Sequence, residues 1–191
     1  MELKLPKPLL KGNKSLEECI YERESVRKYK DKVIEIEKIS QILWAAQGKK
    51  GQKRTVPSAG ATYPLEIYVT LKNKGYFHYD FKNHVLKLIN EEDMVNKLAE
   101  EAWNQKFIEE AYINILICAD YSRTTQRYGE RGIRYVYMEV GHCAQNIHLE
   151  AVALGLVSVP IGAFQDEGVK KVMNLPHNID PLYIVPIAYP K

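Results

Sequence analysis

Two arginines flank a serine in the segment Arg23-Glu-Ser-Val-Arg27. A guanidinium group presents a planar fork of N–H donors that matches phosphate oxygens, and a serine hydroxyl adds another hydrogen-bonding group. The spacing therefore suggests an anion site with Arg23, Ser25 and Arg27 as candidate ligands. The pattern is short, and an exposed charged surface would have the same composition.

A second candidate is the segment that runs from Pro57 to Pro64, in which two prolines bracket small residues. Ser58, Ala59 and Gly60 carry little side-chain bulk, so their backbone amides could approach a flat ligand closely. A purely structural turn is the alternative. The segment is not a P-loop, because no Gly-Lys-Ser/Thr follows.

The third candidate, Val159-Pro-Ile-Gly-Ala-Phe164, lies between an expected strand and an expected helix. Ligands of α/β sheets often bind where strands give way to helices. Gly162 is therefore a candidate, because its amide, or that of Ala163, could point at a ligand atom. Alone, this is a weak signal.

The fourth candidate, Arg123–Arg131, is rich in cations and contains Tyr128. Tyr128 could exchange a proton with a substrate or stack on it. The alternative is an exposed loop before a long helix. No Ser-His-Asp order, carboxylate pair or GxGxxG accompanies these segments, so any chemistry is expected to come from a bound cofactor.

The expected elements alternate between helices and strands. Ser15-Leu-Glu-Glu18 is a capping box, and helical spacing predicts helices over 35–47 and 133–154. Strands are expected over 65–71, 76–79, 84–89, 112–119, 156–161 and 182–188, and shorter helices over 91–101 and 166–174. The fold class is thus α+β, with one mixed, mainly antiparallel sheet between helices.

Length and composition restrict the class of protein. The 191 residues suit a single domain, residues 1–191, and 46% hydrophobic with 27% charged residues is ordinary for a globular protein. The formal charge of +3 gives no argument for nucleic acid, and no apolar run reaches a membrane span. The N-terminus lacks the apolar core of a signal peptide, and the three cysteines are read as reduced and buried. We therefore expect a cytoplasmic protein without nucleic-acid or membrane partners.

The candidate segments, taken in order, resemble the flavin-dependent nitroreductase superfamily. The matching blocks are RESVRKY, ILWAAQG, RTVPSAGATYPLEIYV, RYGERGIRYVYMEVGHCAQNIHLEAVALGL and VPIGAF. They extend from about Arg23 to Pro190. Their residues are most similar to those of the SagB-type branch, which includes azoline dehydrogenases of peptide maturation.

The resemblance implies an intertwined homodimer that binds two FMN molecules at its interface. It implies that Arg23, Ser25 and Arg27 hold the FMN phosphate, with Glu24 beside them through its backbone. The loop with Pro57, Ser58, Ala59 and Gly60 is expected to reach the flavin of the other subunit. Gln105 is the candidate for the pyrimidine edge, Lys191 for the phosphate, and Pro160, Ile161, Gly162 and Ala163 for the flavin ring.

The implied activity is an FMN-dependent oxidoreductase that takes hydride from NAD(P)H and reduces nitroaromatics, quinones or similar small acceptors. Two alternatives remain: a dehydrogenase in peptide maturation and a non-catalytic flavin-binding module. In azoline dehydrogenases a Lys-Tyr pair precedes the long helix, whereas this chain has Arg127-Tyr128. Tyr128 can be carried over as the catalytic candidate, but an arginine stays protonated and cannot act as a base.

Overall fold

The fold is built on one antiparallel sheet, described here from a computed structural model of residues 1–191. Its strands, in order across the sheet, are β1 (Glu2–Lys4), β7 (Val85–Asn90), β6 (Gly75–Asp80), β5 (Leu65–Leu71), β8 (Ile113–Ala119), β10 (Asp180–Pro190) and β2 (Tyr29–Lys30). The short strand β9 (Val157–Ser158) also pairs with β10. All these ladders are antiparallel, and one isolated parallel bridge joins Ser25 to Ser158.

The central strand β8 contributes to two hydrophobic cores. Its seven residues are all buried, as the continuous apolar run predicts. Successive side chains of a strand point to opposite faces, so Ile115 and Ile117 join one core, whereas Leu116 and Cys118 join the other. The neighbouring strand β5 divides in the same way, with Ile67 in the first core and Tyr68 in the second.

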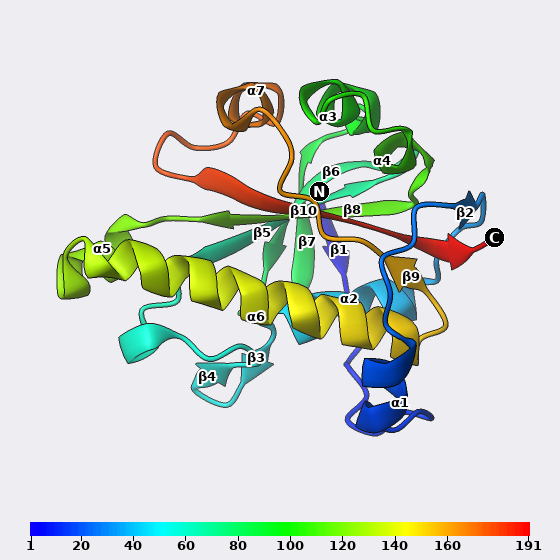
Figure 1. Ribbon diagram of the computed structural model, residues 1–191, viewed down its shortest axis with the longest axis horizontal. Helices are drawn as coiled ribbons and strands as arrows, with labels where there is room; N and C mark the ends of the chain where they lie inside the picture. The colour runs from blue at the N-terminus through cyan, green and yellow to red at the C-terminus, as the bar shows by residue number, and fades with distance from the viewer.

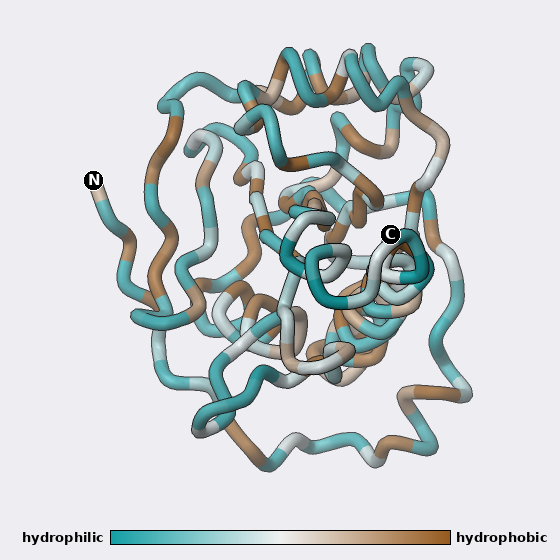
Figure 2. Tube along the Cα trace, turned by 90° about the vertical axis from the view of Figure 1, so that its left-hand side faces the viewer, coloured by the Kyte–Doolittle hydropathy of each residue, from teal (hydrophilic) through white to brown (hydrophobic).

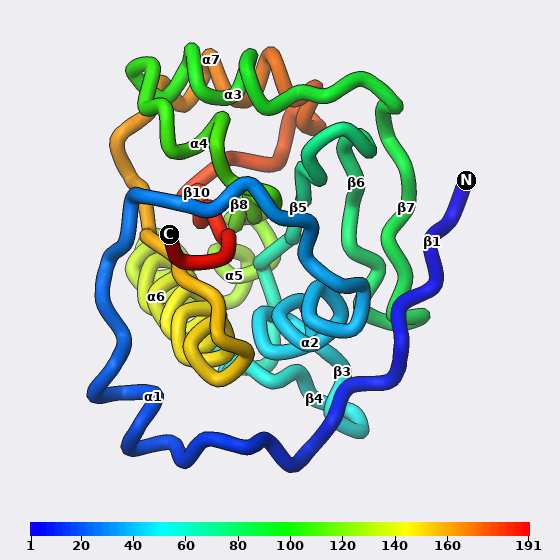
Figure 3. Tube along the Cα trace, turned by 90° about the vertical axis from the view of Figure 1, so that its right-hand side faces the viewer, coloured from blue at the N-terminus to red at the C-terminus, as the bar shows by residue number.

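Helices cover both faces of the sheet (Figures 1 and 3). On one face, α2 (Ile36–Gln47) packs against the long α6 (Arg131–Ala153), and both supply the first core. On the other face lie α3 (Val95–Glu101), α4 (Lys106–Glu110) and α7 (Asp166–Val172), which supply the second core. Hydrophobic stretches follow the strands and recur along the helices, while hydrophilic stretches dominate the loops (Figure 2).

The N-terminal part of the chain runs along the outside of the α2–α6 layer. After β1 it passes α2, where the Gln41 amide group bonds both the N–H and the carbonyl of Leu9. It then forms α1 (Leu16–Glu22), which packs against α6, and crosses to the sheet edge at β2 (Figure 3). The capping box predicted at Ser15 and Glu18 is confirmed.

Most expected elements are confirmed, and β1, β2 and α4 are additional to them. Three further segments differ from expectation. Residues 156–161 form only the two-residue strand β9 and a bridge from Ile161 to Ile184, because the proline at position 160 has no N–H for a ladder. The cationic segment before the long helix is not a loop but a helix, α5 (Ser122–Tyr128). The basic segment after α2 forms a small hairpin, β3 (Lys49–Lys50) and β4 (Lys53–Arg54).

The apolar residues of the long helix are only partly buried. Val136, Val140 and Ile147 are buried, but Ile133 and Tyr137 are 40% and 56% exposed. Met138, the residue after Tyr137, is 52% exposed. The three cysteines are free and buried, as expected. None of the helices is both long and apolar enough to cross a membrane.

Candidate functional site

The R-x-S-x-R segment leaves α1 as extended chain and lies beside β9. Helix α1 ends at Glu22, and Arg23 already has extended dihedral angles (φ −61°, ψ 119°). The N–H of Val26 donates to the carbonyl of Ser158 at 3.2 Å, and Ser25 bridges the same residue. The segment is therefore attached to the strand that leads into Val159–Phe164.

Neither arginine of this segment is neutralised within the chain. Arg23 and Arg27 are absent from all the ion pairs of the protein. Arg27 lies over the ring of Phe107, with its guanidinium carbon 5.7 Å from the ring centroid. Two cations and the exposed Ser25 thus remain available to an anion.

A buried histidine lies beneath this segment. His148 is 3% exposed, and its Nδ1 is 2.7 Å from the hydroxyl of Ser158. Burial, assisted by the charge of Arg23, lowers the pKa of His148 to about 4. The imidazole is therefore neutral near pH 7 and adds no charge to the site.

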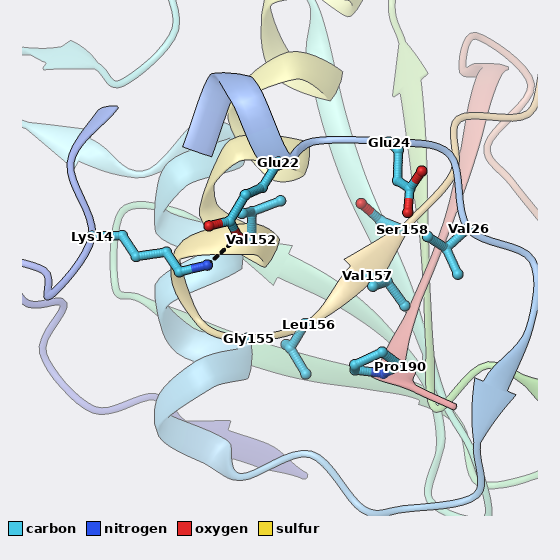
Figure 4. A pocket seen from close by; sticks show the side chains of 10 residues that line it. All are labelled: Lys14, Glu22, Glu24, Val26, Val152, Gly155, Leu156, Val157, Ser158 and Pro190. Carbon is cyan, nitrogen blue, oxygen red and sulfur yellow. Dashed lines mark hydrogen bonds and ion pairs between the residues drawn. The ribbon is translucent and has the colours of Figure 1, made fainter. Parts of the chain in front are cut away.

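The opposite side of the segment borders a small hollow of about 260 Å³ (Figure 4). Glu22, Glu24 and Val26 line it, together with Ser158 and Pro190. Alternation along extended backbone places the side chain of Glu24 here, away from the side on which Ser25 and Arg27 project. Glu24 can thus contribute to an anion site only through its backbone, as the resemblance implies.

The Pro160–Ala163 stretch presents free backbone amides. Ile161 is held to Ile184 by two backbone hydrogen bonds of 2.8 and 3.0 Å, and Phe164 is buried. Between them Gly162 and Ala163 are exposed, and neither N–H donates to any group of the chain. Gln105 fixes this stretch, because its side-chain amide donates to the carbonyl of Ala163 at 3.0 Å.

The Pro57–Gly60 loop lies against α5. Gly60 has a positive φ of 58°, and its carbonyl accepts a hydrogen bond of 3.1 Å from the Arg127 guanidinium. A Cβ at Gly60 would approach the Tyr128 hydroxyl to 2.5 Å and Arg127 Cζ to 2.9 Å. The Tyr128 ring also meets the Tyr135 ring edge-on, at 5.2 Å between centroids. A side chain at position 60 would therefore have to displace the ends of the Arg127 and Tyr128 side chains.

Gln105 and Pro160–Ala163 lie by the second core, and the other predicted residues form two groups toward opposite ends of α6 (Figure 1). The Pro57–Gly60 loop and Tyr128 lie at its start, whereas Arg23–Arg27 and β9 lie at its end. A helix of 23 residues is about 35 Å long. Lys191 follows Pro190, which pairs with Tyr29 beside the second group. No single chain brings the two groups together.

The residues present suit a flat ligand that carries an anionic group. Two unpaired guanidinium groups and Ser25 match the anion, and the free amides of Gly162 and Ala163 match acceptor atoms on a ring. A Cβ at Gly162 would meet only the Tyr183 ring, at 3.4 Å, so the fold itself does not demand glycine there. FMN has this combination of phosphate and planar ring.

A larger hollow, about 840 Å³, lies elsewhere, between the N-terminal segment, α2 and the end of α6. Leu9, Trp44 and Leu149 are among its apolar residues. None of the predicted cofactor-binding residues lines it. Its size alone therefore gives no reason to place the functional site there.

The chain belongs to the nitroreductase family, whose pattern matches residues 20–189. A Methanocaldococcus jannaschii protein named as a nitroreductase is 42% identical over 180 residues, which cover 91% of this chain and 90% of the relative. The microcin B17-processing protein McbC of Escherichia coli is 24% identical over 152 residues, 73% of this chain and 55% of McbC. This relative accords with the resemblance to the SagB-type branch.

Solved structures share the fold. A Ralstonia eutropha crystal structure, also named as a nitroreductase, superposes with a TM-score of 0.88 at 23% identity, covering 100% of this chain and 90% of the other. The NADPH:FMN oxidoreductase of Vibrio harveyi, solved in complex with NAD⁺, gives a TM-score of 0.71 at 22% identity. The match covers 92% of this chain and 69% of the other. The expected nitroreductase-like fold is thereby confirmed.

Sequence reasoning did not single out three polar groups in these two regions. His148 and Ser158 stand on different elements, so no local spacing links them. Glu139 of α6 is 3% exposed although it is acidic. The sequence did indicate a buried acid here, because Glu139 lies among the apolar positions of the long helix. An amphipathic helix normally keeps acids on its outer face.

Replacing Gly60 by alanine tests the close approach of the loop to α5. Gly51 has nearly the same φ, 61°, but open space around it, so Gly51→Ala serves as the matched control. We expect Gly51→Ala to cost about 1 kcal/mol in unfolding free energy from backbone strain, and Gly60→Ala to cost more, because the ends of the Arg127 and Tyr128 side chains must also shift. Urea denaturation measures both losses, and equal losses would contradict the described contact.

Proposed function

We propose that this protein is an FMN-dependent oxidoreductase that takes hydride from NAD(P)H and reduces small acceptors such as nitroaromatics or quinones. One observation carries the proposal: the segment with two unneutralised arginines is bridged to β9, and the stretch that follows β9 has two free backbone amides. Membership of the nitroreductase family supports an oxidoreductase, and the name of the Vibrio harveyi enzyme supports FMN.

The chain's own groups would divide the binding of FMN between them. Arg23, Ser25 and Arg27 would hold the phosphate, with Lys191 as a further cation. The amide of Gly162 or Ala163 would donate to the ring. A bound flavin accepts hydride from one substrate and passes the electrons to another.

The remaining predicted residues would shape the ring site. Pro160 and Ile161 would lie against the ring, and Gln105 would meet its pyrimidine edge. The hydrogen bond from Gln105 to the Ala163 carbonyl gives this side chain a second role, since it holds the stretch whose amides face the ring. Donors fixed in advance stabilise the negative charge of a reduced flavin without reorganisation.

A homodimer would complete the site. An antiparallel pairing of α6 with its copy about a two-fold axis would bring the Pro57–Gly60 loop of one chain to the Arg23–Arg27 segment of the other. The exposed stripe of α6 supports this pairing, because Ile133 and Tyr137 are exposed there and Gly141 has open space around it. Pro57, Ser58, Ala59 and Gly60 would then contact the partner's flavin.

Tyr128 is the proposed substrate-contacting residue. It stands at the end of α5, beside the loop, with Arg127 Cζ 5.4 Å from its ring centroid. A role in stacking on flat acceptors is favoured over proton transfer, because the lysine that accompanies this tyrosine in azoline dehydrogenases is replaced by Arg127. The Arg127 side chain is moreover engaged by the Gly60 carbonyl.

A second candidate is azoline oxidation in peptide maturation, favoured by the similarity to McbC. It requires a base beside Tyr128, and Arg127 cannot supply one. A third, a flavin-binding module without turnover, differs in that it would not consume NAD(P)H. Anaerobic titration of the purified protein with NADH and NADPH distinguishes an oxidoreductase from such a module.

Flavin binding is the first test. The purified protein should be yellow and release FMN on denaturation. Arg23→Ala should weaken FMN binding by about 10- to 150-fold, which corresponds to the 1.5–3 kcal/mol of a charge-assisted hydrogen bond. Lys28→Ala removes the same charge from the same segment but no proposed ligand, and should bind nearly as wild type. A colourless protein that takes up no added FMN would refute the proposal.

The dimer is tested at Gly141, near the middle of α6. Within one chain a Cβ there meets nothing within 4 Å, so Gly141→Leu should fold, and leucine favours the helix. At a close helix–helix contact it should shift the protein from dimer to monomer in sedimentation velocity. Gly12→Leu, also in open space, is the control. A wild-type protein that sediments as a flavin-loaded monomer would contradict the dimer.

Tyr128→Phe separates the two roles of the tyrosine, because it keeps the ring and removes the hydroxyl. Under the stacking role, flavin reduction and quinone turnover should stay within a few-fold of wild type in stopped-flow measurements. A loss of about 10²-fold in the acceptor half-reaction alone would instead assign the hydroxyl to proton transfer.

A further inference from the structure

A buried acid lies directly beneath the Pro57–Gly60 loop. Glu139 belongs to the third turn of α6 and is 3% exposed. Its Oε1 is buried and has no hydrogen-bond partner. Acidic side chains are rarely buried so fully unless they are paired, because removal of a carboxylate from water is costly. The burial of Glu139 therefore indicates a specific role for this residue.

Three elements meet around the carboxyl group. Ser58 of the loop, Arg54 of β4 and Gln47 at the end of α2 each favour its ionised form. Burial has the larger and opposite effect and raises the pKa of Glu139 to about 7. The charged or titratable groups that face it are Arg54 and the fully buried thiol of Cys143.

Arg54 is held in place independently of Glu139. Its guanidinium donates to Gln47 Oε1 at 3.1 Å and to the carbonyl of Leu65 at 3.2 Å, and it lies over the Phe81 ring at 3.7 Å. The guanidinium therefore does not depend on the carboxylate for its position. Of the groups near Glu139, Ser58 is the one that belongs to the Pro57–Gly60 loop.

Ser58 links the acid to the shape of the loop. Its hydroxyl oxygen accepts the N–H of Tyr63 at 2.9 Å, which leaves the hydroxyl proton free to donate. The Tyr63 hydroxyl in turn accepts from the N–H of Arg54 at 3.4 Å. On its other side the loop rests on Arg127 and Tyr128. A carboxylate beneath Ser58 thus completes the set of contacts that surround the loop.

We propose that Glu139 is a positioning residue that holds the Pro57–Gly60 loop in its flavin-contacting conformation by accepting the hydrogen bond of Ser58. The inference rests on the proposed function, in which this loop contacts FMN. The ionised acid is the better acceptor, because hydrogen bonds to charged groups are stronger than neutral ones. Protonation of Glu139 loosens the loop and lowers the affinity for FMN.

The sign of the pH dependence follows from this arrangement. Above the pKa of Glu139 the carboxylate holds the loop, so FMN binds with its full affinity. As the pH falls through about 7, the acid becomes protonated and the affinity decreases. Loss of one charge-assisted hydrogen bond predicts a decrease of roughly tenfold.

The experiment compares the wild-type apoprotein with Glu139→Gln and Glu150→Gln, by quenching of FMN fluorescence between pH 5.5 and 8.5. Glu150 is the matched control, since it lies on the same helix, away from the loop, and burial raises its pKa as well. The FMN phosphate also titrates near pH 6, but equally for all three proteins. Wild type and Glu150→Gln should show the additional step near pH 7, and Glu139→Gln should lack it.

The same step in Glu139→Gln as in wild type would overturn the inference. If wild type binds no FMN at any pH, the proposed function fails, and hydrogen exchange of the apoprotein then tests the positioning role alone. The Tyr63 N–H, which donates to Ser58, should lose protection below pH 7 after correction for the intrinsic rate, while the Leu116 N–H keeps it. Constant protection at Tyr63 would also reject the role, even if Glu139→Gln fails to fold.

Discussion

The structure depends on the burial of one strand from both sides. Every residue of β8 is buried, and its alternate side chains serve two separate cores. A strand without a solvent-facing side needs a helical layer on each face, because apolar surface left in water is costly. The positions of α2 and α6 on one face, and of α3 and α7 on the other, follow from this need.

The long helix α6 determines where the proposed site residues lie relative to one another. Its buried residues fix it against the sheet, and its two ends carry the two groups of proposed ligand-binding residues. Because the helix is rigid, the groups remain separated along its axis within one chain. The exposed Ile133 and Tyr137 are consistent with a second chain that brings opposite ends together.

Local patterns predicted the elements whose sequence period is strong, and missed those that depend on tertiary contacts. The capping box at Ser15, the run of β8 and the spacing of α6 indicated their elements directly. Strand β9 is shorter than expected because Pro160 interrupts it, and the strands β1 and β2 were not predicted, since two or three residues show no period. Helical spacing indicated α6 but does not show which of its apolar positions face the sheet, and Ile133 is 40% exposed.

The residues of the candidate site were likewise predicted only in part. Motif order suggested the arginine segment and the two glycine-containing stretches, and the structure places the first of them beside β9. The roles of these residues remain predictions. His148, Ser158 and Glu139 could not be predicted as partners of these segments, because each acts across elements that are distant in the sequence.

The separation of the two groups by α6 has a genetic consequence in the proposed dimer. Each of its two sites would draw one group from each chain. A chain damaged only in the Arg23–Arg27 segment and a chain damaged only in the Pro57–Gly60 loop could therefore form a mixed dimer in which one site is wholly intact and the other carries both defects. Two inactive alleles of this kind would complement each other, whereas two alleles damaged in the same segment would not.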